Sequence, residues 1–90
     1  MIAIELSSSY YRSIKKFVKG SKKRAELVKK ALGLFQNNPK HPSLHTEKLA
    51  GSENWSIRIN KSDRVFFMWL DKNSVLLIDV GKHDKYNKIK

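Results

Sequence analysis

The sequence contains no cysteine, which excludes disulfides and thiolate zinc sites as sources of stability. It has no apolar run close to the roughly 18 residues that are needed to span a bilayer. Its first residues, MIAIELSSSYYR, lack the basic segment followed by a long apolar segment that marks a secretory leader. We therefore expect a cytoplasmic protein with no membrane partner.

Acidic residues are scarce, because 8 Asp+Glu stand against 19 Lys+Arg and give a formal net charge of +11. A domain this basic attracts polyanions, which can be nucleic acid, an anionic membrane surface or an acidic protein. A general effect on solubility is the alternative, although small soluble domains usually need a net charge of only about 2 to 8. The charge alone does not select one of these partners.

The residues that are present suffice for one folded domain, residues 1–90. The hydrophobic fraction of 40% is ordinary for a globular protein and argues against a disordered basic tail. A chain of 90 residues is too short to bury two separate cores. Any site must therefore be built from the edges of a single core.

Hydrophobic periodicity predicts the element order β-α-α-β-β-β, which is an α+β fold. The predicted elements are a strand at 2–6, a helix capped by one of Ser7 to Ser9 and stopped by Gly20, a second helix from about Lys22, and strands at 55–60, 64–70 and 74–80. We expect the N-terminal helical hairpin to pack on one face of a small, mainly antiparallel four-stranded sheet. The opposite face of the sheet is then free to bind a ligand.

A long segment without periodicity, residues 37–54, separates the second helix from the next strand. It contains both prolines and is predicted to be an ordered loop. Loops of this length in compact domains are more often functional than idle. The segment contributes Glu47 and Lys48 to the candidate site.

The turn between the first two strands of the predicted meander decides where Arg64 lies. A three-residue turn would place Arg64 opposite Asn60, on the same face as Ser56 and Arg58. A two-residue turn would direct the guanidinium toward the helices, where burial without a partner is costly. We expect the first register, which gathers Arg58 and Arg64 on the free face.

Metal and nucleotide cofactors do not fit the sequence. The histidines are His41, His45 and His83, and the first two form an H-x-x-x-H pattern in a proline-containing loop without the helical frame that aligns two ligands. The segment LAGSEN has a single glycine and does not open a helix, so it is no phosphate-binding loop. We expect neither a metal nor a cofactor.

Polar residues at the strand ends form a set that suits metal-free cleavage of RNA. Such a reaction needs a base for the ribose 2′-hydroxyl, cations for the crowded phosphorane and an acid for the departing oxygen. Forked arginine donors match phosphate oxygens well. The set comprises Glu47, Lys48, Arg58, Arg64, His83 and Tyr86.

Simpler roles are open for several of these residues. Glu47 could form a solvated ion pair with Lys48 or with a nearby arginine, which its spacing alone favours. His83 could belong to a charged tail, and the ring of Tyr86 could pack over the end of the sheet. Arg58 could simply occupy the wet face of a strand.

The same residues carry a family likeness. The pattern E-x-L-x-G, then W-S-x-R-I-N-x-x-x-R-V, then an aliphatic strand with a His and Tyr ending resembles the RelE/ParE superfamily of bacterial toxin–antitoxin toxins. The likeness covers nearly the whole chain, and the YoeB-type messenger-RNA endonucleases look like the nearest branch. The VGK segment looks more like the RelE branch, in which an arginine stands at the position of His83.

The resemblance implies roles for individual residues. Glu47 would be the base, Arg64 would hold the phosphate, and His83 and Tyr86 would serve the leaving group. The choice of acid between these two stays open, because Asp84 and Lys85 separate residues that are adjacent in the YoeB branch. The expected RNA contacts are Lys48, Arg58, Lys61, Lys82 and Lys85.

The resemblance also implies partners and a cellular role. The expected partners are a cognate antitoxin, mRNA and the ribosome, with either a homodimer or a hetero-oligomer with the antitoxin as the assembly. The family implies cleavage of mRNA in the ribosomal A site without metal. A ParE-like poison of DNA gyrase and a non-catalytic module that binds RNA or ribosomes are the alternatives.

Overall fold

The computed structural model describes residues 1–82 and has the predicted α+β architecture. Its elements are β1 (Ala3–Leu6), α1 (Ser8–Val18), α2 (Lys22–Asn37), the 3₁₀ turn η1 (Pro42–Leu44), β2 (Glu47–Lys48), β3 (Trp55–Arg58), β4 (Asp63–Asp71) and β5 (Ser74–Lys82). The sheet has five strands, whereas the sequence predicted four, because the two-residue strand β2 joins its edge. Neither helix of this part of the chain is long and apolar enough to cross a membrane.

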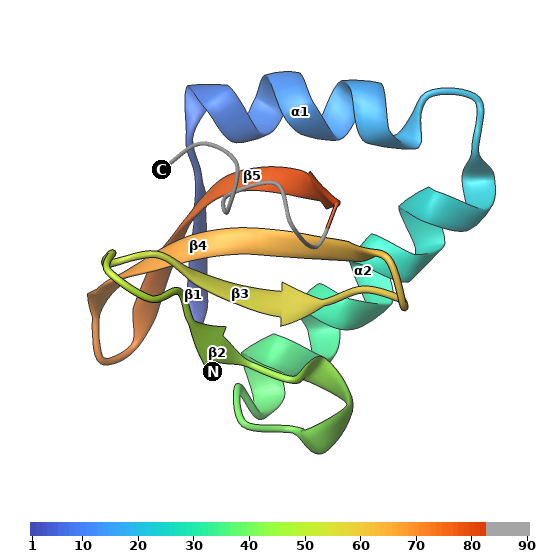
Figure 1. The fold of residues 1–90 in the computed structure, drawn as a ribbon. Helices are drawn as coiled ribbons and strands as arrows, with labels where there is room; N and C mark the ends of the chain where they lie inside the picture. Colours follow the sequence, from blue (N-terminus) through green and yellow to red (C-terminus); the bar gives the residue numbers. More distant parts are fainter. Residues whose placement is uncertain (83–90) are drawn as a thin grey trace.

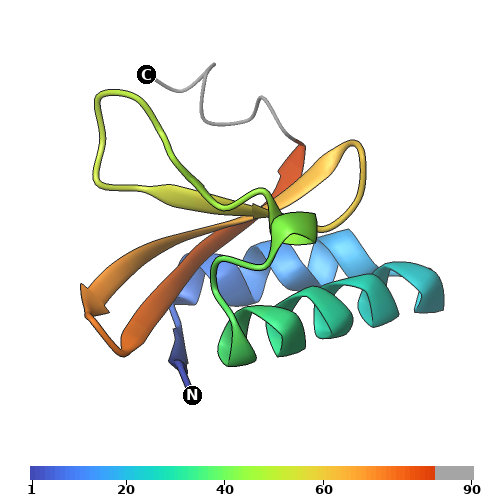
Figure 2. The same cartoon turned by 90° about the horizontal axis from the view of Figure 1, so that it is seen from below.

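The strand order in the sheet is β1-β5-β4-β3-β2. Strand β1 runs parallel to β5, and the other neighbouring strands are antiparallel. Both helices lie on one side of the sheet, and the segment between β2 and β3 extends toward the other side (Figures 1 and 2). The helical hairpin thus covers one face, as predicted.

Serine side chains begin both helices. The Ser7 hydroxyl accepts a hydrogen bond from the Tyr10 amide at 3.0 Å, and the Ser21 hydroxyl accepts one from the Arg24 amide at 3.1 Å. Each serine satisfies an N–H group that the first helical turn leaves without a partner. Gly20, with φ of +71°, makes the left-handed turn between the helices that other residues rarely adopt.

The core lies between the helices and the sheet, and its centre is aromatic. Phe67 on β4 is fully buried, and its ring centroid lies 5.0 Å from that of Phe35 on α2 in an edge-to-face arrangement. Trp55 and Trp69 pack against the same ring, with centroid distances of 6.5 and 5.8 Å. One phenylalanine therefore connects α2 to two strands.

Replacing Phe67 by alanine is expected to remove about 3–5 kcal/mol of folding free energy. The loss combines the transfer of a ring to water with the cavity left among the neighbouring rings, and it is a large share of the roughly 5–15 kcal/mol that stabilise most domains. Urea denaturation followed by circular dichroism measures it. Leu70→Ala is the matched control on the same strand, because Leu70 is 47% exposed; equal losses in the two variants would contradict this account of the core.

The buried phenol of Tyr10 makes stability depend on alkaline pH. Burial raises the pKa of Tyr10 to about 12, whereas a tyrosine in an unfolded chain titrates near 10. Between these values the unfolded chain has lost a proton that the folded chain retains, so stability falls as the pH rises through this window. We expect Tyr10→Phe to gain stability relative to the wild type from about pH 9 to about pH 11 in urea melts. Tyr11→Phe is the matched control, and a constant difference between Tyr10→Phe and wild type would refute the assignment.

Candidate functional site

The strand register gathers polar residues on the face of the sheet that is turned away from the helices. Directly opposed residues in antiparallel strands share a face. Glu47 pairs with Ser56, Ser56 with Phe66, and Phe66 with Asp79; in the next row Arg58 pairs with Arg64, and Arg64 with Gly81. We call this surface, formed by Glu47, Ser56, Arg58, Arg64, Phe66, Asp79 and Gly81, the outer face.

The predicted pairing of Arg64 with Asn60 is wrong, but the predicted face is confirmed. Arg64 lies opposite Arg58, a shift of two residues that preserves the alternation of side chains. The turn is longer than expected because the Asn60 side-chain oxygen accepts hydrogen bonds from the amides of Ser62 and Asp63, at 2.8 and 2.9 Å. Arg58 and Arg64 therefore share the outer face.

One guanidinium nitrogen of Arg64 contacts three neighbouring polar groups. Its Nη1 donates to the backbone oxygen of His45 at 3.2 Å and to the hydroxyl of Ser56 at 3.3 Å. The same nitrogen lies 3.5 Å from Glu47 Oε1. The side chain of Arg64 is 10% exposed, whereas that of Glu47 is 53% exposed. A buried cation thus faces a carboxylate that solvent and ligands can reach.

The Arg64 Nε–H group is buried and has no hydrogen-bond partner among the described residues. Leaving a buried donor unpaired costs about 1–3 kcal/mol, and more for a charged group. Such groups are rare in native proteins, and each calls for an explanation, such as local strain, a catalytic or binding role, or a bound water or ion. An arginine that lacks one acceptor is suited to an oxygen-rich anion such as a phosphate.

The electrostatic environment of Arg64 also favours an anion. Burial lowers the pKa of Arg64 from its ordinary value, Glu47 acts to raise it, and Arg58 lowers it further. Arginine stays protonated at neutral pH despite such shifts. The site therefore holds a poorly solvated positive charge that Glu47 only partly compensates.

His45 joins this cluster, although the sequence analysis considered it only as a metal ligand. Its Nε2 lies 3.0 Å from Arg58 Nη1, and a guanidinium can only donate, so Nε2 is the acceptor. The backbone of His45 is left-handed, with φ of +45°. Its carbonyl oxygen is the one that accepts the hydrogen bond from Arg64. Nothing in the local sequence marks such a conformation. We call the set Glu47, Ser56, Arg58, Arg64 and His45 the Arg64 cluster.

The other predicted contacts lie apart from the Arg64 cluster or outside the described residues. Lys48 pairs with Trp55 and so shares the helix-covered side of the sheet. Lys61 and Lys82 line a pocket with the start of α2, on that same side. The predicted residues His83, Lys85 and Tyr86 lie outside residues 1–82.

A metal centre is not built into the described part of the chain. Residues 1–82 contain no group of three His, Asp or Glu side chains that could hold a metal ion. His45 and His41 are both engaged locally, since His41 Nδ1 accepts from the Ser43 amide at 3.2 Å.

Comparisons with known proteins find chains of similar fold but no protein that is related in sequence. No protein-family profile matches the sequence, and no curated protein does. The similarity is found among solved structures, where it covers almost the entire chain.

Three of these structures are toxins. YafQ from E. coli is 17% identical over 96% of this chain and 98% of its own, with a TM-score of 0.76. The YoeB–YefM complex from Staphylococcus aureus gives 22% identity, 92% and 98% coverage, and a TM-score of 0.72. A YoeB/ParE toxin from Agrobacterium tumefaciens gives 15% identity, 91% and 99% coverage, and a TM-score of 0.74. At these identities the similarity establishes the fold, and the RelE-like fold expected from the motifs is confirmed.

Proposed function

We propose that this protein is the toxin of a type II toxin–antitoxin pair and a metal-independent endoribonuclease that cleaves mRNA. The observation that carries the proposal is the pairing of buried Arg64 with solvent-accessible Glu47 on the outer face. The unpaired Arg64 Nε–H supports it, since a phosphate oxygen would complete its hydrogen bonding. The fold shared with YoeB and YafQ toxins supports it independently.

The proposed reaction is an internal phosphoryl transfer. Glu47 accepts the proton of the ribose 2′-hydroxyl, the 2′-oxygen bonds to phosphorus, and the bond from phosphorus to the 5′-oxygen breaks. Arg64 binds the non-bridging oxygens and stabilises the charge of the phosphorane. His83 or Tyr86 is proposed to protonate the departing 5′-oxygen. The products are a 2′,3′-cyclic phosphate and a 5′-hydroxyl end.

The Arg58 and His45 pair has a supporting role in this proposal. Arg58 lies opposite Arg64 and adds a second cation to the outer face, with its Nη1 held by His45 and its Nε donating to Asn60 O at 3.3 Å. Fixed donors need no reorganisation when charge develops, which is the basis of electrostatic catalysis. Lys48, Lys61, Lys82 and Lys85 are proposed to contact the RNA backbone.

The proposed antitoxin partner follows from fold and charge. YoeB of S. aureus forms a heterotetrameric toxin–antitoxin complex with YefM. A chain with a net charge of +11 suits a partner segment that is acidic or amphipathic. We place this segment over the outer face or the helical hairpin. A complex in which the partner contacts neither surface would refute that placement.

Induced expression with mapping of mRNA 5′ ends tests the proposed function. We expect cuts in phase with codons, as cleavage in the ribosomal A site requires, and 5′-hydroxyl ends that polynucleotide kinase labels without prior phosphatase treatment. The variant Arg64→Met should abolish the cuts. Intact mRNA with accumulating gyrase–DNA adducts would favour a gyrase poison instead. Absence of both cuts and a growth defect would favour a non-catalytic binding module.

A further inference from the structure

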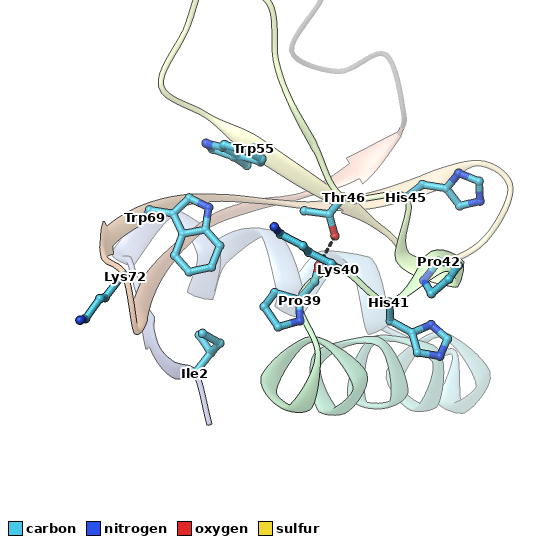
Figure 3. Close-up of a pocket in the computed structure, with 10 residues that line it drawn as sticks. All are labelled: Ile2, Pro39, Lys40, His41, Pro42, His45, Thr46, Trp55, Trp69 and Lys72. Carbon is cyan, nitrogen blue, oxygen red and sulfur yellow. Dashed lines mark hydrogen bonds between the residues drawn. The ribbon is translucent and has the colours of Figure 1, made fainter.

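A second pocket, of about 580 Å³, lies where the loop after α2 meets the helix-covered side of the sheet. Figure 3 shows the indoles of Trp55 and Trp69, the side chain of Ile2 and the ring of Pro39 around the same hollow, with Lys40 extending across it. The volume falls in the range of about 300–1,000 Å³ that is typical of small-molecule sites. The proposed reaction does not use this pocket.

The two indoles form a rigid aromatic corner. Their centroids lie 6.5 Å apart with ring planes at 89°. Trp69 packs against Phe35 at 5.9 Å and Phe67 at 5.8 Å, and Trp55 packs against Phe67 at 6.5 Å. Both rings therefore pack against core phenylalanines and also line the pocket. A ligand that stacks on them would meet a preorganised surface, which reduces the entropy lost on binding.

The charges around the pocket select an anionic ligand. Lys40 and Lys72 line it, and none of the described residues that line it is acidic. Flat apolar walls beside cations suit a nucleotide, which combines an aromatic base with a phosphate. Single-stranded nucleic acids bind proteins in this way, with bases on aromatic rings and the backbone along basic residues.

The pocket and the Arg64 cluster share His45, and the next residue, Thr46, links the pocket to Glu47 along the chain. His45 lines the pocket, while its ring accepts from Arg58 and its carbonyl accepts from Arg64. Thr46 also lines the pocket, with its hydroxyl donating to Pro39 O at 2.6 Å, and Glu47 follows immediately. A strand of RNA bound at Arg64 would reach the indoles by passing around the β2 edge of the sheet.

We propose that the Trp55–Trp69 pocket binds one unpaired nucleotide of the RNA, outside the cleaved phosphodiester. The base stacks on an indole, and Lys40 and Lys72 pair with the backbone phosphates. The identity of the polymer rests on the proposed function. An apolar side chain of an acidic protein could also enter the pocket, but His45, which lines it, contacts both Arg58 and Arg64 on the outer face, and this favours the nucleic acid.

Fluorescence of the two tryptophans tests the pocket without cleavage. An oligoribonucleotide with 2′-O-methyl groups cannot be cut, and we expect it to quench the emission of the wild type. Trp55→Leu should weaken its binding by roughly tenfold, measured by anisotropy of a labelled probe, because one stacking surface is lost. The double variant Lys40→Gln/Lys72→Gln should make the plot of log binding constant against log salt concentration less steep, by an amount that corresponds to roughly one to two lost phosphate contacts.

Controls separate this proposal from the proposed function. Lys15→Gln/Lys29→Gln removes the same charge from exposed helix positions and should leave the salt dependence unchanged. Arg64→Met should fail to cleave RNA, yet RNA should still quench its tryptophan emission. If RNA quenches the emission of the wild type but the wild type never cleaves it, the ribonuclease proposal is refuted and the assignment of the pocket as an RNA-binding site stands. Three results would overturn the assignment of the pocket. RNA could be cleaved without quenching the tryptophan emission, or Trp55→Leu could bind the RNA as tightly as the wild type. The third is that only an acidic leucine-containing peptide, and no RNA, quenches the emission.

Discussion

Arg64→Met is expected to lower the rate of RNA cleavage on the order of 10²- to 10³-fold, the usual effect of removing one preorganised donor from a developing charge. Methionine has a similar length but neither charge nor donors. Because Arg64 Nη1 and the unpaired Nε–H both leave the site, phosphate binding and stabilisation of the phosphorane are lost together. Single-turnover cleavage of a short RNA by purified protein measures the effect.

The stability of Arg64→Met distinguishes a functional from a structural arginine. Removing one partner of a buried ion pair is costly when the charge that remains is itself buried. Glu47 is left without its cation but remains half exposed, so water can solvate it. The backbone oxygen of His45 and the buried hydroxyl of Ser56 lose a donor, so we expect the folding free energy measured in urea to fall by no more than about 1–3 kcal/mol.

Arg12→Met is the matched control for this variant. Arg12 is an exposed residue of α1, so the substitution removes the same charge far from the outer face. It should cleave RNA as the wild type does. A large fall in stability of Arg64→Met, or equal losses of activity in the two variants, would mean that Arg64 holds the fold or only contributes net charge.

The sequence determined the order of elements because each signal was local. Apolar spacing and the capping hydroxyls of Ser7 and Ser21 mark both helices, alternation marks β3, and apolar runs bounded by turn residues mark β4 and β5. Strand β2 was missed because Glu47 and Lys48 are polar and give no alternation. They form a strand only because Ser56 and Trp55 pair with them across the intervening segment 49–54.

The face of the sheet on which Arg64 lies was predictable, because side chains alternate between the two faces along a strand. Arg64 reaches the outer face whether it lies opposite Asn60 or Arg58, since the two registers differ by two residues. An ion pair of Glu47 with a nearby arginine was among the predicted roles, but β2 selects Arg64 as its partner, and the role of His45 requires a left-handed backbone within a long loop. These depend on tertiary packing, which the spacing of residues does not encode. The parts that were missed are therefore the ones that complete the site.

Glu47→Gln is expected to slow cleavage by roughly 10²- to 10⁴-fold, which is the range that general acid–base groups contribute. Glutamine keeps the shape of the side chain but cannot take a proton from the 2′-hydroxyl. Glu47 is exposed at the sheet edge, and a glutamine oxygen can still accept a hydrogen bond from Arg64, so the folding free energy should fall by no more than about 1 kcal/mol. Affinity for an uncleavable RNA should stay the same or rise, because a negative charge leaves the phosphate site.

The ion pair between Glu47 and Arg64 raises the question of whether Glu47 is the base or only positions the arginine. The side chain is 53% exposed, so a small carboxylate can occupy its place in a Glu47→Gly variant. If Glu47 is the base, added formate should restore part of the cleavage rate of this variant in proportion to its concentration. Glu53→Gln, at an exposed position in the same loop, is the matched control and should cleave normally. Full activity in Glu47→Gln would remove Glu47 from the reaction and leave Arg64 as a binding residue alone.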